Sequence, residues 1–181
     1  MHTLKIALSI VVALFLQLLL SKYVGVFRYL DLGLLVMVYV SLQRAPIQGM
    51  LTGLAAGLGS DIISGAILGV GGFSNTLIGY IISIASVRFS LENRLARLGV
   101  VALASVANTL LFVGLYLMLE QNRIAQQILP FANNWAQLGR IIGYKALADT
   151  VAAVFVFVIL DRVFYEQVTA RRMAIKRRVY E

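Results

Sequence analysis

Long apolar segments separated by short polar ones run through almost the whole chain. Two of them, Ile62–Val87 and Leu98–Leu119, carry no charged residue. Both exceed the roughly 20 residues that a helix needs to cross about 30 Å of hydrocarbon. Apolar and polar residues do not alternate as they do in the strands of membrane barrels. The pattern therefore predicts an all-α integral membrane protein.

The first two segments are less regular than these. Ile6–Leu20 has the length of a signal peptide, but Lys22 and Tyr23 follow where a cleavage site needs small residues. We predict a retained helix that spans when it extends to Val26, with the lysine reaching the interface. Leu32–Leu42 is too short to cross comfortably. It is expected to thin the bilayer, to lie shielded inside the bundle, or to pair with the next segment.

The third segment begins at a proline. Pro46 suits the first turn of a helix, where its missing N–H is not needed. We predict a helix from there to about Ser60. Residues Gly65–Gly72 are either the start of the next crossing or a loosened link into it, and that crossing runs to Val87.

The remaining chain predicts two crossings and three short surface helices. Arg88–Arg97 is expected to form one of these on the cytoplasmic surface, before the crossing Leu98–Leu119. Glu120–Gly139 has amphipathic spacing and predicts two interfacial helices, with Trp135 at headgroup level. The last crossing is expected at Arg140–Leu160. Three polar residues of the fifth crossing are expected to bond to a neighbouring helix: Ser105, Asn108 and Thr109.

Basic residues define the predicted topology. With six crossings and an internal N-terminus, eleven of the sixteen Lys and Arg residues fall on the cytoplasmic side and four on the outer side. This bias follows the positive-inside rule. Five crossings, or four and a re-entrant hairpin over residues 30–60, are the alternatives. The prediction is a multi-pass domain of about six transmembrane helices in one compact bundle over residues 1–163, with both termini cytoplasmic.

Residues 164–181 are expected to form a basic cytoplasmic tail. Six of the sixteen basic residues lie between Arg162 and Arg178, just past the last apolar segment, which is the pattern of a cytoplasmic tail, so no nucleic-acid partner is expected despite the net charge of +8. The tail is predicted to contact anionic lipid or to dock a cytoplasmic protein. Its cationic residues are Arg171, Arg172, Lys176, Arg177 and Arg178.

The residue inventory excludes many kinds of chemistry. The chain has no cysteine, and its one histidine is His2. Disulfides, thiolate nucleophiles, Cys/His zinc sites, a catalytic histidine and haem ligation by histidine are therefore excluded. The glycines near residue 70 lack the lysine of a phosphate loop. No catalytic, cofactor-binding or metal-binding residue is predicted, and the protein is not expected to be an enzyme.

Glycine recurs every four residues after Pro46, and Asp61 holds the one position of the series without glycine: Gly49, Gly53, Gly57, Gly65 and Gly69. Positions i and i+4 share one helix face, and small residues there let another helix approach closely. The stripe is either internal packing or a docking surface for another membrane protein. For Asp61, expected near the outer end of its helix, structural hydrogen bonding, partner contact and ion or proton handling are the alternatives.

Lys145 and Asp149 lie one helical turn apart on the last crossing. Such a pair neutralises itself in a medium of low dielectric constant. A self-satisfied packing pair is one interpretation, and a polar cavity or coupling site is the other. An intramembrane aspartyl enzyme would need Asp61 and Asp149 at the same depth.

The run PIQGMLTGLAAGLGSDIISGAILG, residues 46–69, resembles the signature of the MreD family of rod-shape-determining membrane proteins. The proline, the spaced glycines and the aspartate match it. The resemblance implies an inner-membrane subunit of the bacterial cell-elongation machinery. It also implies a six-helix fold similar to the substrate-binding subunits of energy-coupling-factor transporters, and partners that are an MreC-like single-span protein, MreB filaments and peptidoglycan synthases. No catalytic residue is carried over.

The leading hypothesis is a non-enzymatic scaffold that links cytoplasmic filaments to wall synthesis. A small-molecule-binding subunit of a vitamin-type transporter is the alternative, and a lipid-modifying or lipid-flipping protein using Lys145 and Asp149 is a third. A second copy of the same chain, forming a homodimer, is a further candidate partner.

Overall fold

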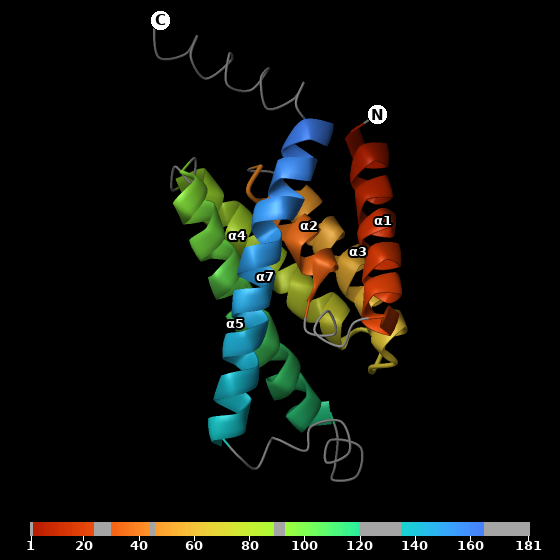
Figure 1. The fold of residues 1–181 in the computed structure, drawn as a ribbon, viewed down its shortest axis with the longest axis vertical. Coiled ribbons are helices and arrows are strands. Elements are labelled where there is room, and N and C mark those ends of the chain that lie inside the picture. Colours follow the sequence, from red (N-terminus) through yellow and green to blue (C-terminus); the bar gives the residue numbers. More distant parts are fainter. Residues whose placement is uncertain (1, 24–29, 44–45, 89–92, 120–134, 165–181) are drawn as a thin grey trace, which may run out of the picture.

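The computed structural model describes residues 2–23, 30–43, 46–88, 93–119 and 135–164, which form six helices and no strand. The helices are α1 (His2–Tyr23), α2 (Leu32–Ser41), α3 (Pro46–Ser64), α4 (Val70–Arg88), α5 (Arg94–Leu119) and α7 (Trp135–Val163). Consecutive helices run in alternating directions, and the first turn of α1 and the last turn of α7 lie at the same end (Figure 1).

Helix α2 is the centre of the arrangement. It contacts each of the other five described helices, and α7 crosses in front of it in Figure 1. All ten of its residues are buried. Of the three expectations for this short segment, shielding inside the bundle is confirmed. A ten-residue helix does not have to span the hydrocarbon layer when neighbouring helices surround it.

Glycines end α3 and start the link to α4. Gly65 and Gly69 have φ angles of +66° and +104°, in the left-handed region that side chains disfavour. Gly65 follows the last turn of α3, and the N–H of Ala66 donates to the carbonyl of Asp61, the six-residue bond of a Schellman motif. Of the two alternatives for Gly65–Gly72, the link is confirmed for residues 65–69, and α3 runs four residues beyond its predicted end near Ser60. The uncharged run Ile62–Val87 is divided between the two helices.

The second half of the chain also differs from its prediction. Arg94 to Arg97 form the first turn of α5 rather than a separate surface helix. Trp135 to Gly139 belong to α7, which is longer at both ends than predicted. Arg88 ends α4, and Asn93 directly precedes α5. The remaining residues of the expected surface and interfacial helices, 89–92 and 120–134, lie outside the described residues. Pro46 begins α3, as predicted.

Apolar side chains cover the outside of the described structure, whereas polar ones lie inside it. Leu103 is 73% exposed and Phe155 is 70% exposed, while Asp61 and Asp149 are buried. In water such a surface would be an aggregation liability, but in lipid it is the favourable arrangement. Two described helices, α4 and Leu95–Leu115 of α5, are long and apolar enough to cross a membrane by length and composition.

Candidate functional site

The closest helix contact is the one between α3 and α4, which we call the glycine seam. A methyl group placed on Gly53 would lie 2.7 Å from the carbonyl carbon of Asn75, and one on Gly57 would lie 2.6 Å from the amide nitrogen of Gly72. Real side chains do not approach backbone so closely, so only glycine fits. The predicted stripe over Gly49, Gly53 and Gly57 thus faces its own bundle.

Helix α4 carries the matching half of the seam, which the sequence reasoning missed. Its residues in contact with α3 again recur every four positions: Gly71, Asn75, Gly79 and Ser83. A methyl group on Gly79 would lie 2.6 Å from the carbonyl oxygen of Gly49. This period was visible in the sequence, but it mixes glycine with asparagine and serine.

Asp61 closes the seam at the far end of α3. Its carboxylate accepts hydrogen bonds from the backbone N–H groups of Gly69 at 2.8 Å, Gly71 at 3.0 Å and Gly72 at 3.3 Å. Those groups stand at the start of α4, where N–H donors have no partner within the helix and the helix dipole favours negative charge. A buried carboxylate is thereby stabilised. Its position in the structure matches structural hydrogen bonding, one of the alternatives for this residue.

A second buried carboxylate joins three helices. Asp149 on α7 accepts from Ser105 Oγ of α5 at 2.6 Å and from the backbone N–H of Asp31 at 3.0 Å. Asp31 in turn caps α2, because its side chain accepts from the Leu34 N–H at 3.0 Å. Asp149 therefore fixes the start of the central helix.

The expected contacts of α5 are partly confirmed. Ser105 bonds to α7, and Asn108 accepts from Ser74 Oγ of α4 at 2.8 Å. Thr109 instead donates to the carbonyl of Ser105 on its own helix, so for that residue the prediction is wrong.

Of the two interpretations of Lys145 and Asp149, the polar cavity matches the structure better than the self-satisfied pair. Within the part of the chain that the structure describes, no ion pair within 4.0 Å joins them. Lys145 instead lines a polar cavity of about 200 Å³ together with Asp31 and Asp61. The structure thus places the lysine with two carboxylates contributed by other parts of the chain.

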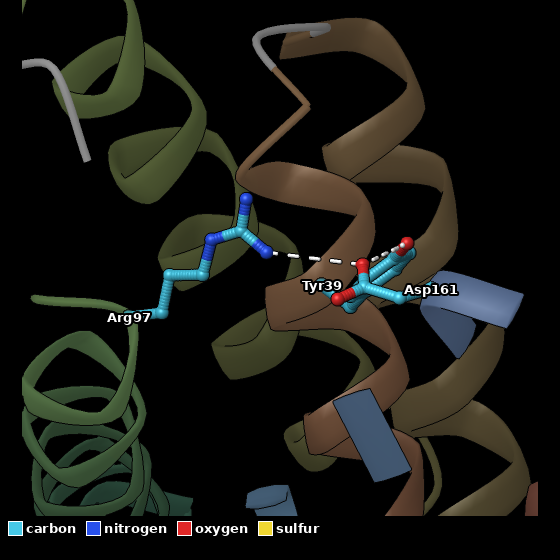
Figure 2. Close-up of polar contacts among 3 residues, drawn as sticks. All are labelled: Tyr39, Arg97 and Asp161. Atoms are coloured by element: carbon cyan, nitrogen blue, oxygen red, sulfur yellow. Dashed lines mark hydrogen bonds and ion pairs between the residues drawn. The ribbon is translucent and has the colours of Figure 1, made fainter. Parts of the chain in front are cut away.

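A third polar cluster lies at the opposite end of α2 (Figure 2). Tyr39 donates through its hydroxyl to Asp161 Oδ1 at 2.9 Å, and Arg97 Nη1 lies 3.8 Å from the same oxygen. The ring of Tyr39 packs against Phe157 and Phe164, with centroids 5.5 and 5.9 Å away. Helices α2, α5 and α7 are therefore joined at both ends of α2.

The sequence reasoning missed Asp31 and Tyr39 as well. An aspartate directly before an apolar run is a capping signal, so Asp31 could have been found. The partners of Tyr39 are more than 100 residues away in sequence, and no local pattern reveals them. The basic tail with Arg171, Arg172, Lys176, Arg177 and Arg178 lies outside the described residues. Among the described side chains, no three of His, Cys, Asp or Glu are grouped as a metal site requires.

The described residues form helices with an apolar exterior and buried carboxylates, an arrangement typical of integral membrane proteins. The family model described as "rod shape-determining protein MreD" matches residues 2–142. The chain belongs to this membrane protein family, and its role is in rod-shape determination. Comparisons with curated proteins and with solved structures found no match.

Proposed function

We propose that the protein is a non-enzymatic scaffold of the bacterial inner membrane, which binds an MreC-like single-span protein and links MreB filaments to peptidoglycan synthesis. The family match over residues 2–142 is the observation that carries the proposal. The buried carboxylates add to it, because Asp61 and Asp149 are engaged by hydrogen bonds that hold helices together. Three features stay predictions: the cytoplasmic termini, the six crossings and a fold like that of energy-coupling-factor subunits.

The partner needs a surface other than the glycine seam. Gly53 and Gly57 are buried against α4, so a second protein reaches them only if the two helices separate. An outward-facing apolar groove of about 440 Å³ runs between α1 and α7, with α2 at its base. Its lining includes Leu8, Val12 and Val156. We assign the single-span helix to this groove, because helices associate in lipid through van der Waals packing and a concave surface offers more of it than a flat one.

A smaller apolar groove supplies the matched control. It measures about 230 Å³ and lies between α4 and α5, with Leu103 in its lining. Val12→Trp should fill the first groove and reduce co-purification of an MreC-like partner at least about tenfold, a loss of roughly 1.4 kcal/mol. Leu103→Trp should leave co-purification unchanged. Equal loss in both variants, or in neither, would show that the partner docks elsewhere.

Depletion of the protein from its rod-shaped host tests the wider proposal. Cells should become wide or round, and re-expression of the chain should restore rods. Cells that keep their width throughout depletion would contradict a role as an elongation scaffold.

A further inference from the structure

The polar cavity of about 200 Å³ lies at the end of the bundle where α3 turns into α4. Helices α1, α3, α4, α5 and α7 and the residues just before α2 contribute to its lining. Ser64, one of the lining residues, is exposed, so the cavity reaches the surface at this end. It is accessible to small solutes although most of its lining lies between helices.

Three buried oxygen atoms of the lining residues have no hydrogen-bond partner within the described part of the chain. They are Asn75 Oδ1, Ser60 Oγ and Gln17 Oε1. Asn75 is 1% exposed. Buried polar atoms of folded proteins are almost always paired, because desolvation without a partner is unfavourable. These oxygens therefore call for a hydrogen-bond donor or a cation in the cavity.

The charges around the cavity are not balanced by the described residues. Asp31 and Asp61 line it, and Asp149 bonds to the backbone of Asp31, so three carboxylates stand against Lys145 alone. The N-termini of α2 and α4, which these aspartates cap, each contribute roughly half a positive charge. With Asp149, which lies behind Asp31 rather than in the lining, the sum is about one negative charge. In a region of low dielectric constant, an uncompensated charge is strongly unfavourable.

We propose that the cavity binds one small monovalent cation, through Asn75 Oδ1, Ser60 Oγ, Gln17 Oε1 and the carboxylate of Asp31. Amide, hydroxyl and carboxylate oxygens are the ligands that hard cations prefer. Unwound backbone and helix ends coordinate sodium in other membrane proteins. A monovalent ion suits the cavity better than a divalent one, because one positive charge completes the local balance and the repulsion by Lys145 doubles for a doubly charged ion.

The thermal unfolding of the purified full-length protein in detergent tests this proposal. Its Tm is measured in sodium, potassium, ammonium and choline chloride at equal ionic strength. At least one of the three small cations should raise Tm in a saturable manner, as expected for a ligand of the native state, whereas choline should not. A response to ammonium alone would indicate that the cavity takes an ammonium group, whereas a response to sodium or potassium would indicate a metal ion.

Two variants and a matched control locate the site. Asp31→Asn keeps the α2 cap, because asparagine caps as well as aspartate, and should weaken the apparent cation affinity about 10- to 100-fold. Asn75→Leu should abolish the saturable response. Asp161→Asn makes the same change of charge at the opposite end of α2 and should leave the response unchanged.

Equal Tm values in choline and in all three small cations would overturn the proposal and assign the cavity to water. So would equal losses in Asp31→Asn and Asp161→Asn, since those indicate a general charge effect. If the variants do not fold, calorimetric titration of the wild-type protein with each small cation decides the question. The absence of any saturable heat would overturn the proposal.

Discussion

The helix pairs α3–α4 and α5–α7 both contain glycine, but they use it in opposite ways. In the glycine seam, Gly53 and Gly57 lie where any side chain would overlap the backbone of α4. In the second pair, nothing lies within 4 Å of a methyl group placed on Gly99, Gly114, Gly139 or Gly143. Polar contacts such as the one from Ser105 to Asp149 join α5 to α7 instead. A glycine therefore indicates close helix packing only where the backbone of another helix lies against it.

The largest effect is expected in the glycine seam. Gly57→Leu inserts a side chain where the backbone of α4 lies, and overpacking against backbone has little room to relax. The free energy of unfolding should fall by at least about 3 kcal/mol. Gly114→Leu on α5 is the matched control, and it should change stability by less than about 0.5 kcal/mol. Thermal unfolding of both variants in the same detergent provides the measurement. If Gly57→Leu and Gly114→Leu lowered stability equally, the two helix pairs would not differ in their need for glycine.

Removal of the cap on α4 should have the next largest effect. Asp61→Ala leaves the N–H groups of Gly69, Gly71 and Gly72 without their acceptor. We expect a loss of about 2 kcal/mol, because charged caps and buried donors are both involved. Asp61→Asn should recover part of it. A variant Asp61→Ala as stable as the wild type would show that the carboxylate does not hold the seam closed.

The hydrogen bond between Ser105 of α5 and Asp149 of α7 should contribute less to stability than the Asp61 cap. A double-mutant cycle with Ser105→Ala and Asp149→Ala isolates the bond between α5 and α7, because neither variant retains its side-chain partner. Its coupling energy should be about 1 kcal/mol, within the range found for hydrogen bonds between helices in membranes. Chemical unfolding of the four proteins measures it. A coupling energy near zero would mean that apolar packing alone joins these helices.

The smallest effects are expected at the other end of α2. Tyr39→Phe removes one hydrogen bond to Asp161 but keeps the aromatic contacts, so we expect a loss of about 0.5–1 kcal/mol. Arg97→Gln should change stability by less than about 0.5 kcal/mol, because the Asp161 side chain is 48% exposed and water screens the pair. The same unfolding assay ranks the two variants. The reverse order would indicate that the ion pair is the main contact of this cluster.

Periodicity predicted the helices well where local chemistry decides the structure. Pro46 starts α3, and the apolar runs mark α4 and α5, because proline geometry and hydrophobic length act locally. Helix α3 ends at Ser64 rather than near Ser60, because the glycine period alone does not mark where the left-handed turn begins. Gly65 and Gly69 belong to the turn.

The candidate site was harder to predict than the helices. Asp61 and Asp149 stood out as carboxylates in apolar surroundings, but their partners depend on three-dimensional packing. The expected partner of Asp149 was Lys145, four residues away, whereas its observed partners are Ser105 and Asp31. Spacing along the sequence points to partners on the same helix. A buried carboxylate is instead stabilised by any donor that the fold brings within hydrogen-bond distance.

The cap on α4 also sets an order of events during synthesis. Asp61 is made before the glycines whose N–H groups it accepts, so its charge has no partner while α3 emerges alone. Only when the chain through Gly72 has followed can the carboxylate leave water without penalty. The contact that closes the end of the glycine seam is therefore completed only after the residues through Gly72 have been made.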